Sequence, residues 1–414
     1  MVKKFKIPWA AWREPEFIEL TFPDLWNVSL YKMNGSDVPE LSEKEIEQSI
    51  LNPIGTQNIS KLAKDKSNIV IVIDDMTRPT PISKILPYVL NELKQVDIND
   101  EQITILLAVG AHRPMTRQDC ILKLGKDFVN RFKIENHHPY ENLEYLGESS
   151  RGTPIYVNKT YLNADLRITI GGVIPHPLAG FGGGAKIVLP GVCGIKTLEA
   201  NHSASMGEKG GGIGRMTDAR RDIEEIAEKV GLDFSINVIL SDYGKISKMF
   251  CGHFKDAHKK AMEFGKQFYS TKIDQNNQIC FFNSYPEDSE LNQAQYKPFN
   301  FLISAPRTTL DKEGAIVIMT SSYEGRGYHS LLGETGTVLY KNLGDTIIWE
   351  IFANNRRVYL FSPNVSESDK NHYFPKSVKL FYDWNDLIQQ LEKDYGSSPK
   401  AAIIPSSIQL CERE

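Results

Sequence analysis

The sequence lacks the features of three large classes of protein. No stretch approaches the roughly 20 consecutive apolar residues that span a bilayer, and no apolar stretch follows the N-terminal lysines. We therefore expect neither a membrane protein nor a secretory signal. The net charge of -4 indicates no strongly basic face of the kind that general nucleic-acid binders carry. The sequence thus predicts a protein that acts on neither membranes nor nucleic acids.

Cysteine is scarce and scattered along the chain. The five residues are Cys120, Cys193, Cys251, Cys280 and Cys411, and no two of them form a CxxC pair. We expect neither a disulfide framework nor a thiolate zinc site, and a reducing cytoplasm is the simplest location. The sequence also lacks the GxxxxGK[ST] of P-loops, the HExxH of zinc proteases, and GxGxxG in a strand–turn–helix setting.

Short apolar runs rich in Val and Ile predict strands that are buried on both faces, as in parallel sheets. The runs are Asn68–Ile73, Ile103–Val109, Leu166–Ile170, Ile236–Leu240, Phe299–Ser304, Ala315–Met319 and Arg357–Phe361. Helical patterns lie between them, such as Pro81–Leu93 and Thr217–Gly231, where Thr217 suits the N-cap and Gly231 the C-terminal end. This alternation predicts an α/β architecture with mainly parallel sheets.

The length of 414 residues favours two domains. The polar stretch Thr271–Gln278 follows a helix-like segment, His258–Phe268, and predicts a boundary there. We expect an N-terminal domain over residues 1–270 and a C-terminal α/β domain over residues 271–414. The default position for the active site is an interdomain cleft.

Reactive side chains follow the first two predicted strands. Asp75, Thr77 and Arg78 come after one strand, and His112 comes after the next. Ligands of open α/β sheets bind beyond the carboxyl ends of the strands. An arginine grips a carboxylate or phosphate with two hydrogen bonds, and a histidine suits acid–base chemistry near neutral pH. The structural alternatives are an Asp75–Arg78 ion pair and a histidine that only caps or packs.

The third predicted strand leads into the glycine-rich loop PHPLAGFGGGAK. It holds His176 between two prolines, then Gly182, Gly183 and Gly184, and ends at Lys186. Such glycines permit positive φ and bare N–H groups to a ligand; a flexible hinge with a solvated lysine is the alternative. A short helix-like segment then ends at His202. A lone histidine is a weak metal signal, so a metal there needs ligands from elsewhere, such as a cofactor.

These motifs resemble the nickel-dependent lactate racemase family of 2-hydroxyacid racemases and epimerases. DDMTRPTP, GAHRPMT, PHPLAGFGGGAK and ANH stand in that family's order and spacing, and the resemblance runs from about Leu51 to past Tyr285. It implies an isomerase of two α/β domains. It also implies a nickel-pincer nucleotide (pyridinium-3-thioamide-5-thiocarboxylic acid mononucleotide nickel) that cofactor-maturation enzymes supply.

The resemblance also implies a role for each site residue. The cofactor is attached covalently at Lys186, His202 is the nickel ligand, and Asp75, Thr77, Gly182, Gly183 and Gly184 lie against the cofactor. His112 and His176 are the catalytic acid/base groups, and Arg78 binds the substrate carboxylate. The reaction is reversible hydride transfer through a 2-keto acid, which avoids removing a weakly acidic α-hydrogen as a proton.

The C-terminal part departs from the family pattern. Relatives often have a glutamine followed three residues later by a substrate-binding lysine. Here Lys297 comes four residues after Gln293, and Tyr296 occupies the expected place. One residue rotates a helical side chain by about 100°. Either Lys297 reaches the substrate carboxylate differently or the substrate is not lactate. We expect Gln293 and Lys297 to bind substrate and favour a different or larger 2-hydroxyacid.

Two other functions fit parts of the sequence. A hydrolase or lyase would bind an ordinary divalent metal through His112, His176 and His202. A non-catalytic nucleotide-binding protein would use the glycine loop and Arg78. Among the remaining histidines, His253, His258, His329 and His372 have no partner motif.

Overall fold

The chain folds into two compact units in a computed structural model that describes residues 2–205, 213–333, 336 and 356–412. Unit 1 comprises residues 1–36, 268–328 and 342–414, and unit 2 comprises residues 37–267 and 329–341. The chain passes from unit 2 to unit 1 close to the predicted boundary at 270. The division otherwise differs from the predicted one, because the first 36 residues group with the C-terminal part and a short later segment returns to unit 2.

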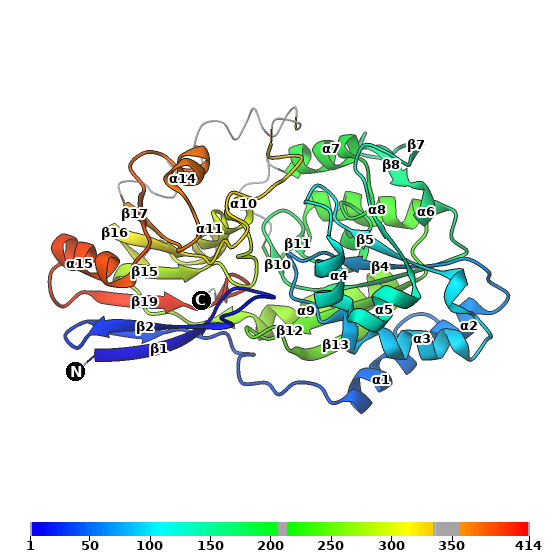
Figure 1. The fold of residues 1–414 in the computed structure, drawn as a ribbon, viewed down its shortest axis with the longest axis horizontal. Coiled ribbons are helices and arrows are strands. Elements are labelled where there is room, and N and C mark those ends of the chain that lie inside the picture. Colours follow the sequence, from blue (N-terminus) through cyan, green and yellow to red (C-terminus); the bar gives the residue numbers. More distant parts are fainter. Residues whose placement is uncertain (1, 206–212, 334–335, 337–355, 413–414) are drawn as a thin grey trace. The chain divides into compact units, whose positions relative to one another are not determined.

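Unit 2 is built on a six-stranded sheet in the order β13-β12-β9-β4-β5-β6 (Figure 1). All neighbouring pairs are parallel except β12–β13, which is antiparallel. The strands are β4 (Ile69–Asp74), β5 (Ile103–Ala108), β6 (Lys133–Asn136), β9 (Leu166–Gly172), β12 (Phe234–Leu240) and β13 (Ile246–Gly252). Every residue of β4 and β5 is buried, as their unbroken apolar runs predict.

Helices and two small hairpins complete unit 2. The helices are α1 (Glu43–Leu51), α2 (Ile59–Ala63), α3 (Leu86–Lys94), α4 (Arg117–Leu124), α5 (Lys126–Arg131), α6 (Lys159–Leu162), α7 (Ile195–Ser205), α8 (Asp218–Val230) and α9 (Phe254–Phe268). Three short 3₁₀ helices are η1 (Ile82–Lys84), η2 (Asp100–Gln102) and η3 (Gly184–Ile187). The hairpins pair β7 (Leu143–Glu148) with β8 (Pro154–Asn158), and β10 (Pro175–His176) with β11 (Gly180–Phe181).

Helix α8 forms where the capping pattern predicts. The side chain of Thr217 accepts a hydrogen bond from the Arg220 amide, and Gly231 ends the helix with φ +84°. Its apolar side joins a core cluster with Val70, Val72 and Leu106 of the sheet. The predicted helix at Pro81–Leu93 forms as η1 followed by α3.

Unit 1 holds a second six-stranded sheet, in the order β18-β17-β16-β15-β19-β3, with all pairs parallel. Its strands are β3 (Asn27–Leu30), β15 (Asn277–Asn283), β16 (Leu310–Met319), β17 (Arg357–Phe361), β18 (Lys379–Phe381) and β19 (Lys400–Ile404). Strand β3 pairs with β19, which places the N-terminal segment in this unit. The mainly parallel sheets of both units confirm the predicted α/β class.

Both faces of the unit 1 sheet are covered. Phe281 contributes to one core cluster and its neighbour Phe282 to the other, because successive side chains of a strand point to opposite faces. The hairpin of β1 (Val2–Pro8) and β2 (Phe17–Pro23) packs on one face, and Figure 1 shows it in blue beside the red β19. The other elements are α10 (Leu291–Ala294), α11 (Lys297–Ser304), α14 (Glu367–Tyr373), α15 (Trp384–Tyr395) and the short pair β14 (Ser270–Thr271) and β20 (Leu410–Cys411).

One predicted strand is wrong. Phe299–Ser304 lies in helix α11, and the strand of this region is β15, which the sequence analysis did not identify. A short apolar run does not distinguish a buried strand from a buried helix. Pro298 stands in the first turn of α11, where its fixed φ favours a helix start. Among the described helices, none has the length and apolar character needed to cross a membrane.

Candidate active site

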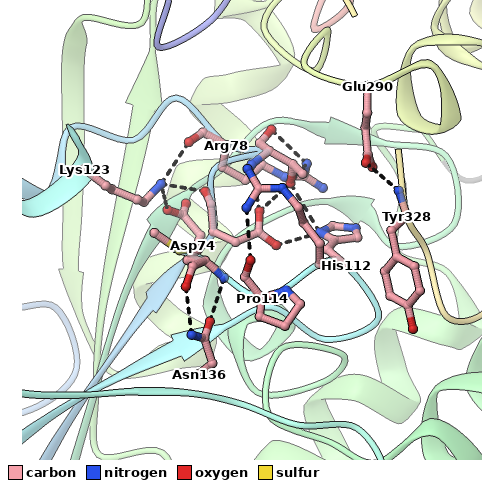
Figure 2. Close-up of polar contacts among 12 residues, drawn as sticks. Asp74, Arg78, His112, Pro114, Lys123, Asn136, Glu290 and Tyr328 are labelled. Carbon is pink, nitrogen blue, oxygen red and sulfur yellow. Dashed lines mark hydrogen bonds and ion pairs between the residues drawn. The ribbon is translucent and has the colours of Figure 1, made fainter. Parts of the chain in front are cut away.

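The turn after β4 is held in place by a buried lysine. Lys123 of α4 pairs with Asp74 Oδ1 at 2.8 Å, and its Nζ also donates to the carbonyl oxygens of Asp75 (2.7 Å) and Arg78 (2.9 Å), as Figure 2 shows. The other oxygen of Asp74 accepts from Thr80 Oγ1 and from the Gly172 amide. A buried charge is tolerated when it is paired and hydrogen-bonded, so these contacts fix the segment that carries Asp75 and Arg78.

Asp75 and His112 form the best-defined pair of reactive groups. Their Oδ2 and Nδ1 atoms are 2.6 Å apart, and Thr77 donates to Asp75 Oδ1 through both its hydroxyl (2.5 Å) and its amide (2.8 Å). Burial would raise the pKa of Asp75, but the charge and hydrogen bond of His112, followed by Arg78, hold it well below its usual value. The ionised carboxylate thus holds the Nδ1–H of His112 and leaves Nε2 as the basic nitrogen.

Arg78 stands beside this pair. Its Nη1 donates to the carbonyl oxygen and the hydroxyl of Thr77, at 3.2 and 3.0 Å, and its side chain is partly exposed. Its charge acts on Asp75, while Thr77 and His112 supply hydrogen bonds to that carboxylate. This arrangement keeps a guanidinium next to the imidazole that can act as a base.

His176 lies on the short strand β10. Its Nδ1 accepts from the amides of Leu178 and Ala179, both at 3.2 Å. The neutral ring therefore carries its hydrogen on Nε2, the opposite arrangement to that of His112. The expected pairing of His112 and His176 across a substrate stays a prediction.

Two buried side chains bind backbone carbonyl groups of the glycine loop. His258 Nε2 donates to the Gly182 carbonyl at 2.7 Å, and Arg220 Nη1 donates to the Gly183 carbonyl at 3.2 Å. Arg220 also donates to His258 Nδ1 at 2.8 Å and pairs with Glu224. Burial, then the charge of Arg220, lowers the pKa of His258 well below its usual value. Sequence motifs gave no signal for either residue.

Glycine is required at two positions of this loop. Gly183 and Gly184 have φ of +71° and +55°, a region that L side chains rarely adopt. A Cβ at Gly183 would lie 2.5 Å from Val173, and one at Gly184 would lie 2.9 Å from the His258 ring. The turn continues into η3, which carries Lys186. The glycines thus permit a tight turn that delivers the lysine.

His202 and Lys186 lie in one neighbourhood with His112. Nδ1 of His202 donates to the Leu198 carbonyl at 2.8 Å within α7, which leaves Nε2 with its lone pair. Burial, then the charge of Lys186, lowers the pKa of His202 to about 4, and His112 contributes further. A neutral imidazole with a defined tautomer is the form that binds a metal.

The described residues include no group of three or more His, Cys, Asp or Glu side chains that could hold a metal ion. His112, His176 and His202 therefore do not form the three-histidine centre that the hydrolase or lyase alternative requires.

His329 is a member of this cluster that the sequence analysis missed. It forms a backbone bridge with His112, and the two rings lie edge to face with centroids 5.1 Å apart. Ser330 donates its amide to the Ala111 carbonyl at 2.7 Å. These contacts place the segment that begins at 329 in unit 2, and no motif near His329 predicts them.

Gln293 and Lys297 belong to unit 1. Gln293 lies in α10, and Lys297 forms a buried ion pair with Glu287, with Nζ and Oε2 2.5 Å apart. Burial raises the pKa of Tyr296 well above its usual value. The substrate-binding roles of Gln293 and Lys297 stay predictions.

The sequence and the fold are similar to those of lactate racemases. The family described as the lactate racemase N-terminal domain matches residues 14–214, which include every candidate residue from Arg78 to His202. The lactate racemase of Lactiplantibacillus plantarum is 35% identical over 303 residues, which cover 70% of this chain and 70% of that protein. The lactate racemase of Thermoanaerobacterium thermosaccharolyticum is 27% identical over 405 residues, which cover 93% of this chain and 92% of that protein.

The solved structure of the lactate racemase apoprotein from Thermoanaerobacterium thermosaccharolyticum matches this fold with a TM-score of 0.77 at 26% identity, and the match covers 100% of both chains. Sequence similarity over most of the length and a shared fold thus agree. The chain therefore belongs to the lactate racemase family of isomerases.

Proposed function

We propose that this protein racemises or epimerises a 2-hydroxyacid by reversible hydride transfer to a nickel-pincer nucleotide attached at Lys186. The observation that carries the proposal is the cluster of Lys186, His202, His112 and Asp75 in unit 2, where each group acts electrostatically on another. The lysine would hold the cofactor, and the histidines and carboxylate would serve the metal and the substrate.

The residues fit this cofactor. His202 offers an Nε2 lone pair while its Nδ1–H is bound to a backbone carbonyl, and burial keeps the ring neutral. Lys186 follows a turn in which Gly183 and Gly184 leave no room for side chains. When bound, the cofactor would supply a reversible acceptor for the hydride on C2 of the substrate. Loss of that hydride and of the hydroxyl proton converts the 2-hydroxyacid to a 2-keto acid.

His112 would remove the proton of the substrate hydroxyl. Asp75 binds its Nδ1–H and stays ionised, so Nε2 can accept the proton and the carboxylate stabilises the charged ring. Arg78 would bind the substrate carboxylate with its guanidinium. Asp75 and Thr77 would therefore act behind His112, at the edge of the cofactor site.

His176 would serve the opposite enantiomer, because the hydroxyl groups of two enantiomers lie on opposite sides. Its Nδ1 accepts two backbone amides, so Nε2 carries the hydrogen in the neutral ring. To accept a proton at Nε2, the neutral ring must first carry its hydrogen on Nδ1. Nδ1 can then no longer accept the hydrogen bonds from the two backbone amides. We infer that His176 releases these bonds during each cycle.

The buried Lys297–Glu287 pair supports a substrate other than lactate. An ammonium that is already neutralised by a buried carboxylate has less to offer a substrate carboxylate. Together with the changed spacing from Gln293, this favours a different or larger 2-hydroxyacid. Five free cysteines fit a reducing cytoplasm, where maturation enzymes would load the cofactor.

The test is to produce the protein together with cofactor-maturation enzymes and to measure its intact mass and its racemase activity. We expect a mass adduct on Lys186 and loss of optical rotation with at least one member of a panel of pure 2-hydroxyacid enantiomers. Lys186→Ala should abolish adduct, nickel content and activity, while Lys259→Ala, at an exposed position on α9, should change none of them. Full activity and nickel content in Lys186→Ala would refute the proposal.

A further inference from the structure

His329 lies against the candidate base, His112, and the proposed reaction gives it no role. Its ring lies edge to face against His112, with centroids 5.1 Å apart and planes at 63°. The backbone bridge between the two residues, with the adjoining hydrogen bond from the Ser330 amide to the Ala111 carbonyl, holds His329 beside His112.

The hydrogen bonds of His329 fix its tautomer. The Leu331 amide donates to Nδ1 at 3.2 Å, so Nδ1 is an acceptor and the neutral ring carries its hydrogen on Nε2. Within the described parts of the chain, no protein atom accepts a hydrogen bond from this Nε2–H. His329 is half-buried, so this Nε2–H remains available to donate to a ligand oxygen.

The surroundings of His329 keep it neutral. Burial, then the charges of His112 and His202, lowers its pKa well below the usual value, and Lys186 acts in the same direction. A ring that stays neutral does not compete with His112 for the substrate proton. Its Nε2–H can only donate a hydrogen bond. This donor lies beside the proposed base and beside the groups that are proposed to hold the cofactor.

We propose that His329 is a substrate-binding residue whose Nε2–H donates to the C2 oxygen of the 2-hydroxyacid, the oxygen whose proton His112 removes. Two imidazoles with centroids 5.1 Å apart are close enough for one oxygen atom to contact both. The donor would orient the hydroxyl toward His112 and stabilise the oxygen as its proton leaves. This inference rests on the proposed function, since it requires a 2-hydroxyacid at the site.

Two substitutions of His329 separate the effect of its Nε2–H donor from the effect of its aromatic ring. His329→Phe keeps an aromatic ring against His112 and removes the donor, whereas His329→Gln removes the ring and places an amide N–H near the position of Nε2. His138→Phe, at an exposed position, is the matched control. We expect kcat/KM to fall by about 10- to 100-fold in His329→Phe, the loss of one hydrogen bond, and to recover at least partly in His329→Gln.

Two measurements independent of turnover accompany the kinetics. Intact mass should show the same Lys186 adduct in all variants, and calorimetry should show that His329→Phe binds the substrate 2-hydroxyacid about 10-fold more weakly than the wild type does. The inference is overturned if His329→Phe keeps wild-type kcat/KM, if His329→Gln is no better than His329→Phe, or if the adduct is lost. Failure of the wild type to racemise any 2-hydroxyacid would instead refute the proposed function.

Discussion

Replacement of Asp75 by asparagine tests how the structure prepares His112 as a base. Thr77 donates two hydrogen bonds to Oδ1 of Asp75, and His112 donates to Oδ2. An asparagine has one oxygen and one NH₂ group, and the two donors of Thr77 will keep the oxygen on their side. The NH₂ group then faces Nδ1 of His112 and donates to it. The hydrogen of the ring moves to Nε2, which is the nitrogen that must accept the substrate proton.

The expected loss has two parts. A hydrogen bond to a charged group contributes about 1.5–3 kcal/mol, which is about 10- to 150-fold in rate when it acts in the transition state. A wrong tautomer adds to this loss, and the same change in the Ser-His-Asp triad lowers kcat by about 10⁴. We therefore expect kcat/KM of Asp75→Asn to fall by about 10²- to 10⁴-fold.

The assay follows the loss of optical rotation of a pure 2-hydroxyacid enantiomer at pH 6, 7 and 8. The low pKa of Asp75 keeps it ionised across this range, so titration of Asp75 does not contribute to the pH dependence of the wild-type activity. Asp65→Asn, at an exposed position with φ +59° that asparagine tolerates, is the control. If Asp75→Asn carries the Lys186 adduct and keeps activity within about threefold of the wild type, His112 is not the base that Asp75 prepares.

The strands of unit 2 could be predicted because their chemistry is local. A run such as Ile103–Ala108 is apolar on both faces and rich in β-branched and Leu residues, as a covered parallel strand requires. The prediction failed at Phe299–Ser304, where a short and mostly apolar run fits a strand or a helix equally well. Assignment of the first 36 residues to unit 1 depends on pairing of β3 with β19, and no local pattern encodes a partner so distant in the chain.

The candidate site divides in the same way. Asp75 and Lys186 stand in strand-end and loop motifs, so their chemistry is visible in a few consecutive residues. The roles of three other residues are not visible in their local sequence, because each acts through a contact with a distant segment. These residues are Lys123, Arg220 and His329. Their residue types are common on helices and loops, and only burial beside the motif residues distinguishes them. Sequence motifs therefore identify the groups proposed to react, and the structure adds those that hold them.

Three further predictions concern the scaffold around the site. Gly183→Ala should lower the fraction of protein that carries the cofactor adduct and cost about 1–3 kcal/mol of unfolding free energy, whereas Gly152→Ala, which also has positive φ but open space, should cost only its backbone strain. Burial lowers the pKa of His137 to about 4 from 6.5, so the unfolded chain takes up this proton first, and this group alone should lower stability by about 2 kcal/mol between pH 7.5 and 5. His137→Asn should show a correspondingly shallower acid loss in denaturant titrations, and an unchanged slope would contradict the assignment. Lys297→Met should destabilise the protein by about 3 kcal/mol, because it removes the ammonium that pairs with the buried carboxylate of Glu287. Addition of Glu287→Gln should restore most of that stability, and a single variant that loses substrate affinity while its unfolding free energy is unchanged would show that Lys297 serves the substrate and not the fold.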